Sequence, residues 1–190
     1  MVAPMHLQAP RIAPLSDAEL TEEQRAALAP VMETGPAINI FRTLARAPKA
    51  LTAFLAWGGY ILSRKQNALA PREREIVILR IGYLCRSGYE WTQHVGIGKR
   101  SGLSDDEIER IKSGLGFNAA DSALIKACDE LHASQFISDS TWAALSSHFS
   151  EKQCMDTVFT AGQYTQVSMM LNTFGVQLDP GQSLDPDLRA

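Results

Sequence analysis

Three polar side chains in the middle of the chain have the types and the spacing that acid–base chemistry requires: Glu75, Glu90 and His94. Glu90 and His94 are four residues apart, so on a helix their side chains share one face. An imidazole titrates near neutral pH, and a neighbouring carboxylate stabilises its charged form. Glu75 directly precedes an apolar run, where burial would raise the pKa of a carboxyl group. These residues are the predicted catalytic group, with His94 as the proton carrier.

Each of these residues also has a purely structural interpretation, and the sequence leaves both open. His94 could be a core histidine that is hydrogen-bonded to a carbonyl group. Ser87 and Glu90 fit the S/T-x-x-D/E pattern of a capping box, so both could simply start a helix. Glu75 could be a first-turn carboxylate that the helix dipole favours.

Four further residues are candidates for substrate binding. Arg80 interrupts the apolar run, and a buried guanidinium either pairs with an acidic residue or binds a substrate carboxylate. The structural role is the favoured one for Arg80. Ser87, Trp91 and Tyr164 complete the group, although the aromatic residues are most simply core residues. Cys85 is interpreted as a small buried side chain rather than a reactive thiolate.

The order of these residues resembles a known motif. Glu75 is followed after eleven residues by Ser87, after two more by Glu90, and after three more by His94. This spacing resembles the γ-carboxymuconolactone decarboxylases and alkyl hydroperoxidase D-like proteins, whose redox branch carries E-x(11)-C-x-x-C-x(3)-H. Glu75 and His94 match the glutamate and the histidine of that motif, whereas Ser87 and Glu90 occupy the two cysteine positions. The resemblance covers roughly residues 39–176 and indicates a variant that lacks the redox cysteines.

The resemblance implies an all-α fold, a homo-oligomer (a trimer or a multiple of dimers or trimers) and one of two chemistries. A thiol peroxidase needs a low-pKa cysteine with a resolving partner, and neither is in frame here. We therefore expect a cofactor-independent lyase, decarboxylase-like or isomerising, that transfers a proton on a small carboxylated or lactone-type substrate, as in the catabolism of aromatic compounds. Thiol peroxidase activity and a non-catalytic binding or scaffold role are the alternatives. No metal site is expected, because Glu90 and His94 supply only two ligands.

The elements that must hold these residues are all predicted to be helices. No stretch alternates with the period of a strand, and short loops join the apolar-periodic segments, which indicates a single-domain helical bundle. Its domain is expected at residues 16–176, between an extended arm at 1–15 and a loosely held tail at 177–190. The helices are expected at about residues 16–33, 38–46, 49–64, 71–86, 89–100, 104–113, 118–131, 138–148 and 151–174.

Burial of the apolar helices favours self-association. We expect the run Ile76–Ile81 and the helix carrying Gly58 and Gly59 to need more covering surface than one protomer supplies. The arm could pack on a neighbouring subunit.

Composition excludes several partners. The chain has 190 residues, 45% apolar and 21% charged, with a net charge of −3 and mixed signs, so neither a nucleic-acid footprint nor a basic membrane patch is indicated. It has no predicted signal peptide and no apolar run of about 18 residues. Three separated cysteines suit a reducing compartment, and a cytoplasmic location is expected.

Overall fold

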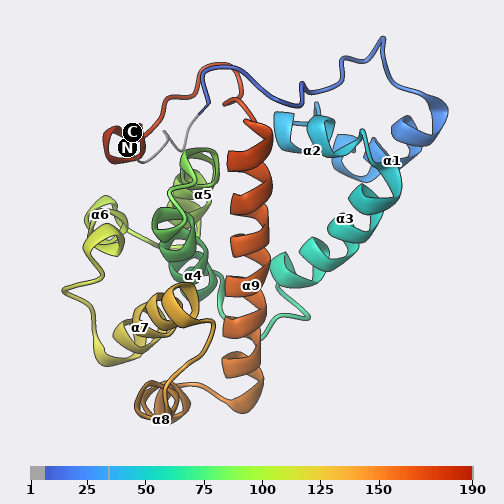
Figure 1. Cartoon of the computed structure of the whole chain (residues 1–190). Coiled ribbons are helices and arrows are strands. Elements are labelled where there is room, and N and C mark those ends of the chain that lie inside the picture. The colour runs from blue at the N-terminus through green and yellow to red at the C-terminus, as the bar shows by residue number, and fades with distance from the viewer. Residues whose placement is uncertain (1–6, 34, 190) are drawn as a thin grey trace.

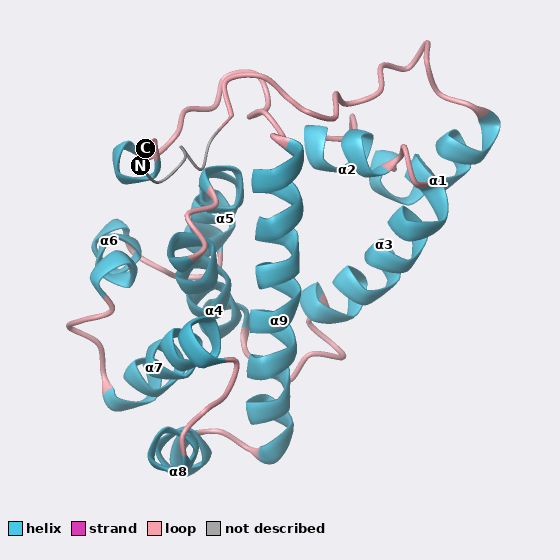
Figure 2. Ribbon diagram, viewed as in Figure 1, coloured by secondary structure: helices cyan, strands magenta, loops and turns pink. Residues whose placement is uncertain are grey.

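The computed structural model describes residues 7–33 and 35–189, and this part of the chain contains helices and no strands (Figures 1 and 2). The elements are α1 (Glu22–Met32), α2 (Asn39–Leu44), α3 (Pro48–Leu62), α4 (Pro71–Leu84), α5 (Gly88–Arg100), α6 (Asp105–Ser113), α7 (Ala119–Ser134), α8 (Asp139–His148), α9 (Glu151–Phe174) and the short 3-10 helix η1 (Pro186–Leu188). The predicted all-α fold is confirmed.

Helix α4 is the centre of the bundle, packed against α5, α6, α7 and α9 (Figure 1). It begins with Pro71 at a position where the missing N–H costs nothing, and the Glu73 carboxylate accepts a hydrogen bond from the Ala70 N–H. The apolar side chains of Ile76–Ile81 are fully buried within one chain. The expectation that this run needs a second subunit to cover it is therefore wrong, because α5, α7 and α9 already enclose it.

Helices α1, α2 and α3 form a separate layer, which packs against the side of α9 opposite α4 and α5 (Figure 1). Helix α1 starts later than predicted. Ser16 and Glu19 make an isolated turn, in which Ser16 N and Oγ donate to Glu19 Oε2 at 2.8 and 2.6 Å. The helix itself begins after Thr21, whose hydroxyl and the Gln24 side chain form the real capping box. The predicted caps at Ser104, Asn118 and Ser150 are confirmed.

The two ends of the chain are tied to the body of the same protomer. Residues 7–15 run past the C-terminus of α9, where Arg11 N–H donates to the Phe174 carbonyl at 2.9 Å. Gly175 ends α9 with φ of 69°, and a Cβ there would lie 3.2 Å from the Ala9 carbonyl oxygen, so glycine permits the close approach. The described part of the arm thus packs on its own chain; residues 1–6 lie outside the described residues.

The tail after α9 is also anchored, contrary to the expectation that it is loosely held. Asp179 accepts hydrogen bonds from Tyr89 Oη (2.8 Å) and Gln93 Nε2 (2.6 Å) on α5. Lys112 on α6 binds Asp185 and Asp187, each at 2.9 Å, and Leu188 of η1 is buried beside these contacts. The tail has no helical sequence pattern, yet it is held in place. Its partners on α5 and α6 are distant in sequence, so a local pattern could not reveal them.

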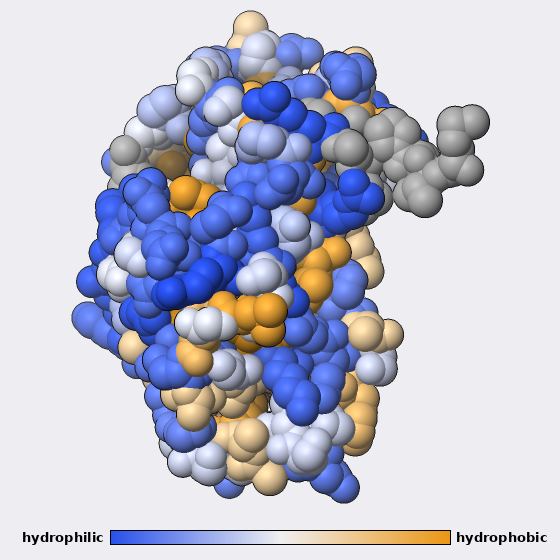
Figure 3. Space-filling view, turned by 90° about the vertical axis from the view of Figure 1, so that its left-hand side faces the viewer, coloured by the Kyte–Doolittle hydropathy of each residue, from blue (hydrophilic) through white to orange (hydrophobic). Residues whose placement is uncertain are grey.

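Among the described residues, no helix is both long and apolar enough to cross a bilayer. The side of the molecule where α6, α7 and α8 lie is mainly hydrophilic, with apolar side chains in small patches (Figure 3).

Candidate active site

Two glycines allow α4 and α5 to pack closely. A Cβ on Gly82, near the end of α4, would lie 3.3 Å from Glu90 Cγ at the start of α5. A Cβ on Gly98, near the end of α5, would lie 3.3 Å from Leu79 Cδ1 and 3.9 Å from Glu75 Cβ. The end of each helix thus faces the start of the other, so the pair is antiparallel. This approach brings Glu75 within reach of the α5 face that carries Glu90 and His94.

His94 lies between the two carboxylates. Its Nδ1 is 2.7 Å from Glu75 Oε2, and its Nε2 is 3.0 Å from Glu90 Oε1. All three side chains are buried, with exposed fractions of 1% for Glu75, 4% for Glu90 and 7% for His94. The Tyr164 ring of α9 meets the imidazole edge-on, with a centroid distance of 5.0 Å. We call Glu75, Glu90 and His94 the carboxylate–imidazole cluster.

The cluster holds His94 in its charged form. Burial alone would lower the pKa of the imidazole, but the Glu90 and Glu75 carboxylates outweigh it and raise that pKa to about 10. With a carboxylate at each ring nitrogen, both nitrogens donate protons, as only an imidazolium can. Burial, together with the same two carboxylates, raises the pKa of Tyr164 well above its usual value, so its hydroxyl stays protonated.

Arg74 is a member of this environment that sequence reasoning missed. It lies in the charged segment at the start of α4, yet its side chain is buried and its Nη1 donates to the Ser63 carbonyl at 3.3 Å. Burial lowers its pKa, and its charge acts on Glu75 and Tyr164. Arg74 and His94 together balance the charges of Glu75 and Glu90. One feature of the sequence could have indicated that Arg74 is buried. It lies four residues before the apolar Ile78, so on a helix the two side chains share one face.

The buried polar atoms that have no hydrogen-bond partner among the described residues include Glu75 Oε1, Arg74 Nε and Ser87 Oγ. Ser87 occupies the position before α5, but its hydroxyl makes no capping bond. Glu90 also makes no capping bond there and faces His94 instead. The capping-box interpretation of Ser87 and Glu90 is therefore wrong. Buried polar atoms are normally hydrogen-bonded, so these unpaired atoms are suited to bind a water molecule or a polar group of a ligand.

Two of the predicted substrate-binding residues are held elsewhere. Arg80 donates from Nε to Asp129 at 2.6 Å and from Nη1 to the Ile111 and Lys112 carbonyls at 2.7 and 2.8 Å, so it ties α4 to α7 and closes the end of α6. Trp91 packs against Tyr83 (5.6 Å between centroids) under the Lys112 ammonium. These contacts agree with the structural role that the sequence favoured for Arg80 over substrate binding, because its donors are used inside the fold.

The three cysteines do not form a redox pair in this structure. All are free thiols; Cys128 and Cys154 are buried, and Cys85 is partly exposed. Burial raises the pKa of Cys85, and its position at the C-terminus of α4 further disfavours a thiolate. Among the described residues, no group of three or more His, Cys, Asp and Glu side chains could hold a metal ion.

The chain matches a known family and several known structures. Residues 48–132 match the model of the carboxymuconolactone decarboxylase family, a range that contains the whole carboxylate–imidazole cluster. No curated protein matches the sequence.

The similar solved structures share the fold at low sequence identity. One is the alkylhydroperoxidase AhpD core, an uncharacterized peroxidase-related protein from Ralstonia eutropha, with a TM-score of 0.75, 20% identity, and coverage of 89% of this chain and 93% of that chain. A peroxidase-related protein from Silicibacter has a TM-score of 0.73, 17% identity and coverage of 94% and 93%. A protein of unknown function from Agrobacterium tumefaciens has a TM-score of 0.65, 20% identity and coverage of 71% and 94%.

Proposed function

Because residues 48–132 of the chain belong to the carboxymuconolactone decarboxylase family, we propose that the protein is a cofactor-independent proton-transfer enzyme, a lyase or isomerase acting on a small carboxylated or lactone-type substrate. The observation that carries the proposal is the buried His94 imidazolium between Glu75 and Glu90.

A decarboxylation needs a proton donor for the carbanion or enolate that forms when carbon dioxide leaves. When the bond to the carboxylate carbon breaks, carbon dioxide leaves and the electron pair stays on the substrate as an enolate. That enolate must take up a proton, and His94 is charged at neutral pH because its pKa is raised to about 10. Glu90, in contact with His94 Nε2, returns a proton from solvent to the ring and completes the cycle. An isomerase would use the same groups and return the proton to a different carbon.

The charge balance of the site suits an anionic substrate. Two carboxylates alone would repel an anionic substrate, but the positive charges of Arg74 and His94 offset them. In a buried, water-poor environment these fixed charges act strongly on charge that develops on the substrate. Ser87 Oγ and Glu75 Oε1, which lack partners in the described chain, are the groups that would meet its polar atoms.

Thiol peroxidase chemistry is the second candidate, and one observation favours it. Cys85 Sγ lies 3.6 Å from His132 Nδ1 and is partly exposed, so a thiol and an imidazole are adjacent. The raised pKa of Cys85 argues against it, since the thiolate is the nucleophile.

Deuterium incorporation tests the proposal across a panel of candidate substrates. β-Keto acids and γ-carboxymuconolactone would each be incubated with the protein in D2O, and NMR would follow both loss of substrate and deuterium at the reacting carbon. We expect His94→Asn to slow turnover by about 10²–10⁴-fold, and Cys85→Ser to leave it unchanged. Hydroperoxide consumption with a dithiol donor that is lost in Cys85→Ser, and unaffected by His94→Asn, would instead establish the peroxidase.

A further inference from the structure

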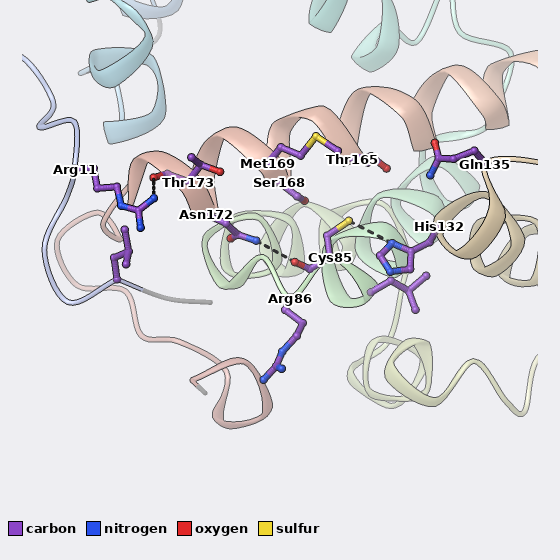
Figure 4. Close-up of a pocket in the computed structure, with 12 residues that line it drawn as sticks. Arg11, Cys85, Arg86, His132, Gln135, Thr165, Ser168, Met169, Asn172 and Thr173 are labelled. Atoms are coloured by element: carbon purple, nitrogen blue, oxygen red, sulfur yellow. Dashed lines mark hydrogen bonds between the residues drawn. The ribbon is translucent and has the colours of Figure 1, made fainter. Parts of the chain in front are cut away.

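A cavity of about 580 Å³ runs along α9, and no residue of the carboxylate–imidazole cluster lines it (Figure 4). Thr165 and Thr173 both line it, and eight residues of helix rise by about 12 Å, so the cavity is elongated. Arg11 lies at one end, and His132 with Gln135 at the other (Figure 4). Sites for small organic ligands have volumes of this order.

In the described part of the chain, the charged side chains that line the cavity are all basic. They are Arg11 and Arg86; His132 also lines the cavity, and no Asp or Glu takes part, although Asp and Glu (21) outnumber Lys and Arg (18) in the chain as a whole. Toward the other described residues, the Arg11 guanidinium makes only a long bond, 3.4 Å from Nη1 to the Thr173 carbonyl. A guanidinium fork matches the geometry of a carboxylate. The charge of the lining therefore complements an anion.

A buried polar group in the wall gives independent support. Ser168 is 1% exposed, and apart from the neighbouring Cys85 sulfur its Oγ has no hydrogen-bond partner among the described residues. Asn172, one turn further along α9, donates from Nδ2 to the Cys85 carbonyl at 3.0 Å. A buried hydroxyl without a full set of partners in a cavity wall is the kind of group that a ligand or a water satisfies.

Most of the remaining wall is apolar, although Thr165, Thr173 and Gln135 also line it. Leu7, Leu84 and Met169 line the cavity, and Met169 is 63% exposed on a helix whose neighbouring positions face the core. An apolar wall with a guanidinium at one end fits a molecule that has an apolar body and one anionic head.

We propose that this cavity binds an elongated, amphipathic carboxylate such as a medium-chain acyl acid. Its carboxylate pairs with Arg11, and its chain lies along Leu84 and Met169 toward His132. The ligand passes over the Cys85 sulfur and restricts access to it. This site is distinct from the carboxylate–imidazole cluster, and the proposal does not depend on the proposed function.

Ligand binding in the cavity can be measured through the rate at which the Cys85 thiol is alkylated. Alkylation by iodoacetamide, a neutral reagent, would be followed by peptide mass mapping, which separates Cys85 from the buried Cys128 and Cys154. Sodium octanoate should slow alkylation of Cys85 in a saturable manner, by about tenfold at ten times its apparent Kd. Octylamine, of matched length and opposite charge, should give no protection. Equal protection by octylamine, or none by octanoate, would overturn the proposal.

Variants with matched controls locate the effect. Met169→Glu places a negative charge on the wall at an exposed position that tolerates substitution, and should weaken octanoate protection by at least about tenfold, whereas Met169→Gln should retain it. Arg11→Gln should also weaken protection by about tenfold, because a charge-assisted pair is lost. Arg25→Gln on α1, which does not line the cavity, should behave as the wild type. If Met169→Glu and Met169→Gln protect alike, octanoate does not bind in this cavity.

Discussion

Glu75 Oε2 and His94 Nδ1 lie 2.7 Å apart, although the residues are nineteen positions apart and their side chains are almost completely enclosed. The contact makes Glu75 a direct partner of the imidazole, alongside Glu90 on His94's own helix. Because a charged ring and two carboxylates share one buried volume, the stability of the fold and the chemistry of the site depend on the same protons.

Stability should fall as pH rises above neutrality. In the folded protein the pKa of His94 is raised to about 10, whereas in the unfolded chain it is near its usual value of 6.5. The folded state therefore holds one more proton, and the stabilisation, complete below about pH 6.5, is lost as pH rises through 10. Each pH unit in this window should cost up to about 1.4 kcal/mol. Urea unfolding from pH 7 to 9 measures the slope, and histidine NMR should show the imidazolium persisting to pH 9. A slope that is unchanged in His94→Gln would contradict this account.

His94→Gln should lower both stability and activity. The substitution leaves Glu75 and Glu90 buried without a cation between them, and breaking a buried pair costs about 3–5 kcal/mol. Glu90→Gln keeps an acceptor for the ring and should cost less. Thermal unfolding and turnover are measured on the same samples; a destabilised variant with full turnover would identify His94 as a core histidine only.

Gly98→Ala should disturb the site through helix packing. Its Cβ would meet Leu103 Cδ1 at 3.2 Å and Leu79 Cδ1 at 3.3 Å, so either these side chains or α5 must shift by a few tenths of an ångström, and His94, one turn before Gly98, shifts with α5. We expect reduced turnover and a small loss of stability. Gly162→Ala on α9 is the control, because no described atom lies within 4 Å of its Cβ and alanine favours the helix by up to about 1 kcal/mol. If both substitutions raise the melting temperature and leave turnover unchanged, close packing at Gly98 is not needed.

Arg80→Met should destabilise the fold without changing catalysis. The guanidinium holds Asp129 and two carbonyl oxygens at the end of α6, and their loss should cost about 2–4 kcal/mol. Denaturant unfolding measures this cost, and kinetics at a temperature where the variant is folded measures KM. A large rise in KM with little loss of stability would restore a substrate-binding role.

Self-association is expected through α3 rather than α4. Trp57 and Leu62 on α3 are 41% and 44% exposed, and space around Gly58 and Gly59 is open within 4 Å of their Cβ positions. Light scattering should therefore show a stable oligomer at micromolar concentration, and Trp57→Glu should dissociate it. A wild-type monomer under these conditions would refute the prediction.

The sequence alone determined the elements and one half of the site. The proline at the start of α4 and the serine and asparagine caps of α6 to α9 are local signals, since a cap depends on residues three positions apart. The Glu90–His94 contact is local in the same way, because four residues make one turn of a helix. Its position before the apolar run placed Glu75 in the predicted site, and the resemblance agreed, but neither said how Glu75 contacts the ring.

Tertiary structure decided the rest, because burial and ionisation depend on partners that no local pattern specifies. Arg74 and Arg80 both lie on α4, yet one balances the charge of the cluster and the other ties α4 to α6 and α7; only the packing of α4 in the bundle distinguishes them. Ser87 matched a capping pattern but does not cap, because close packing of α4 and α5 turns Glu90 toward His94. The tail lacked helical pattern, and its order comes from Asp179 contacts about ninety residues away.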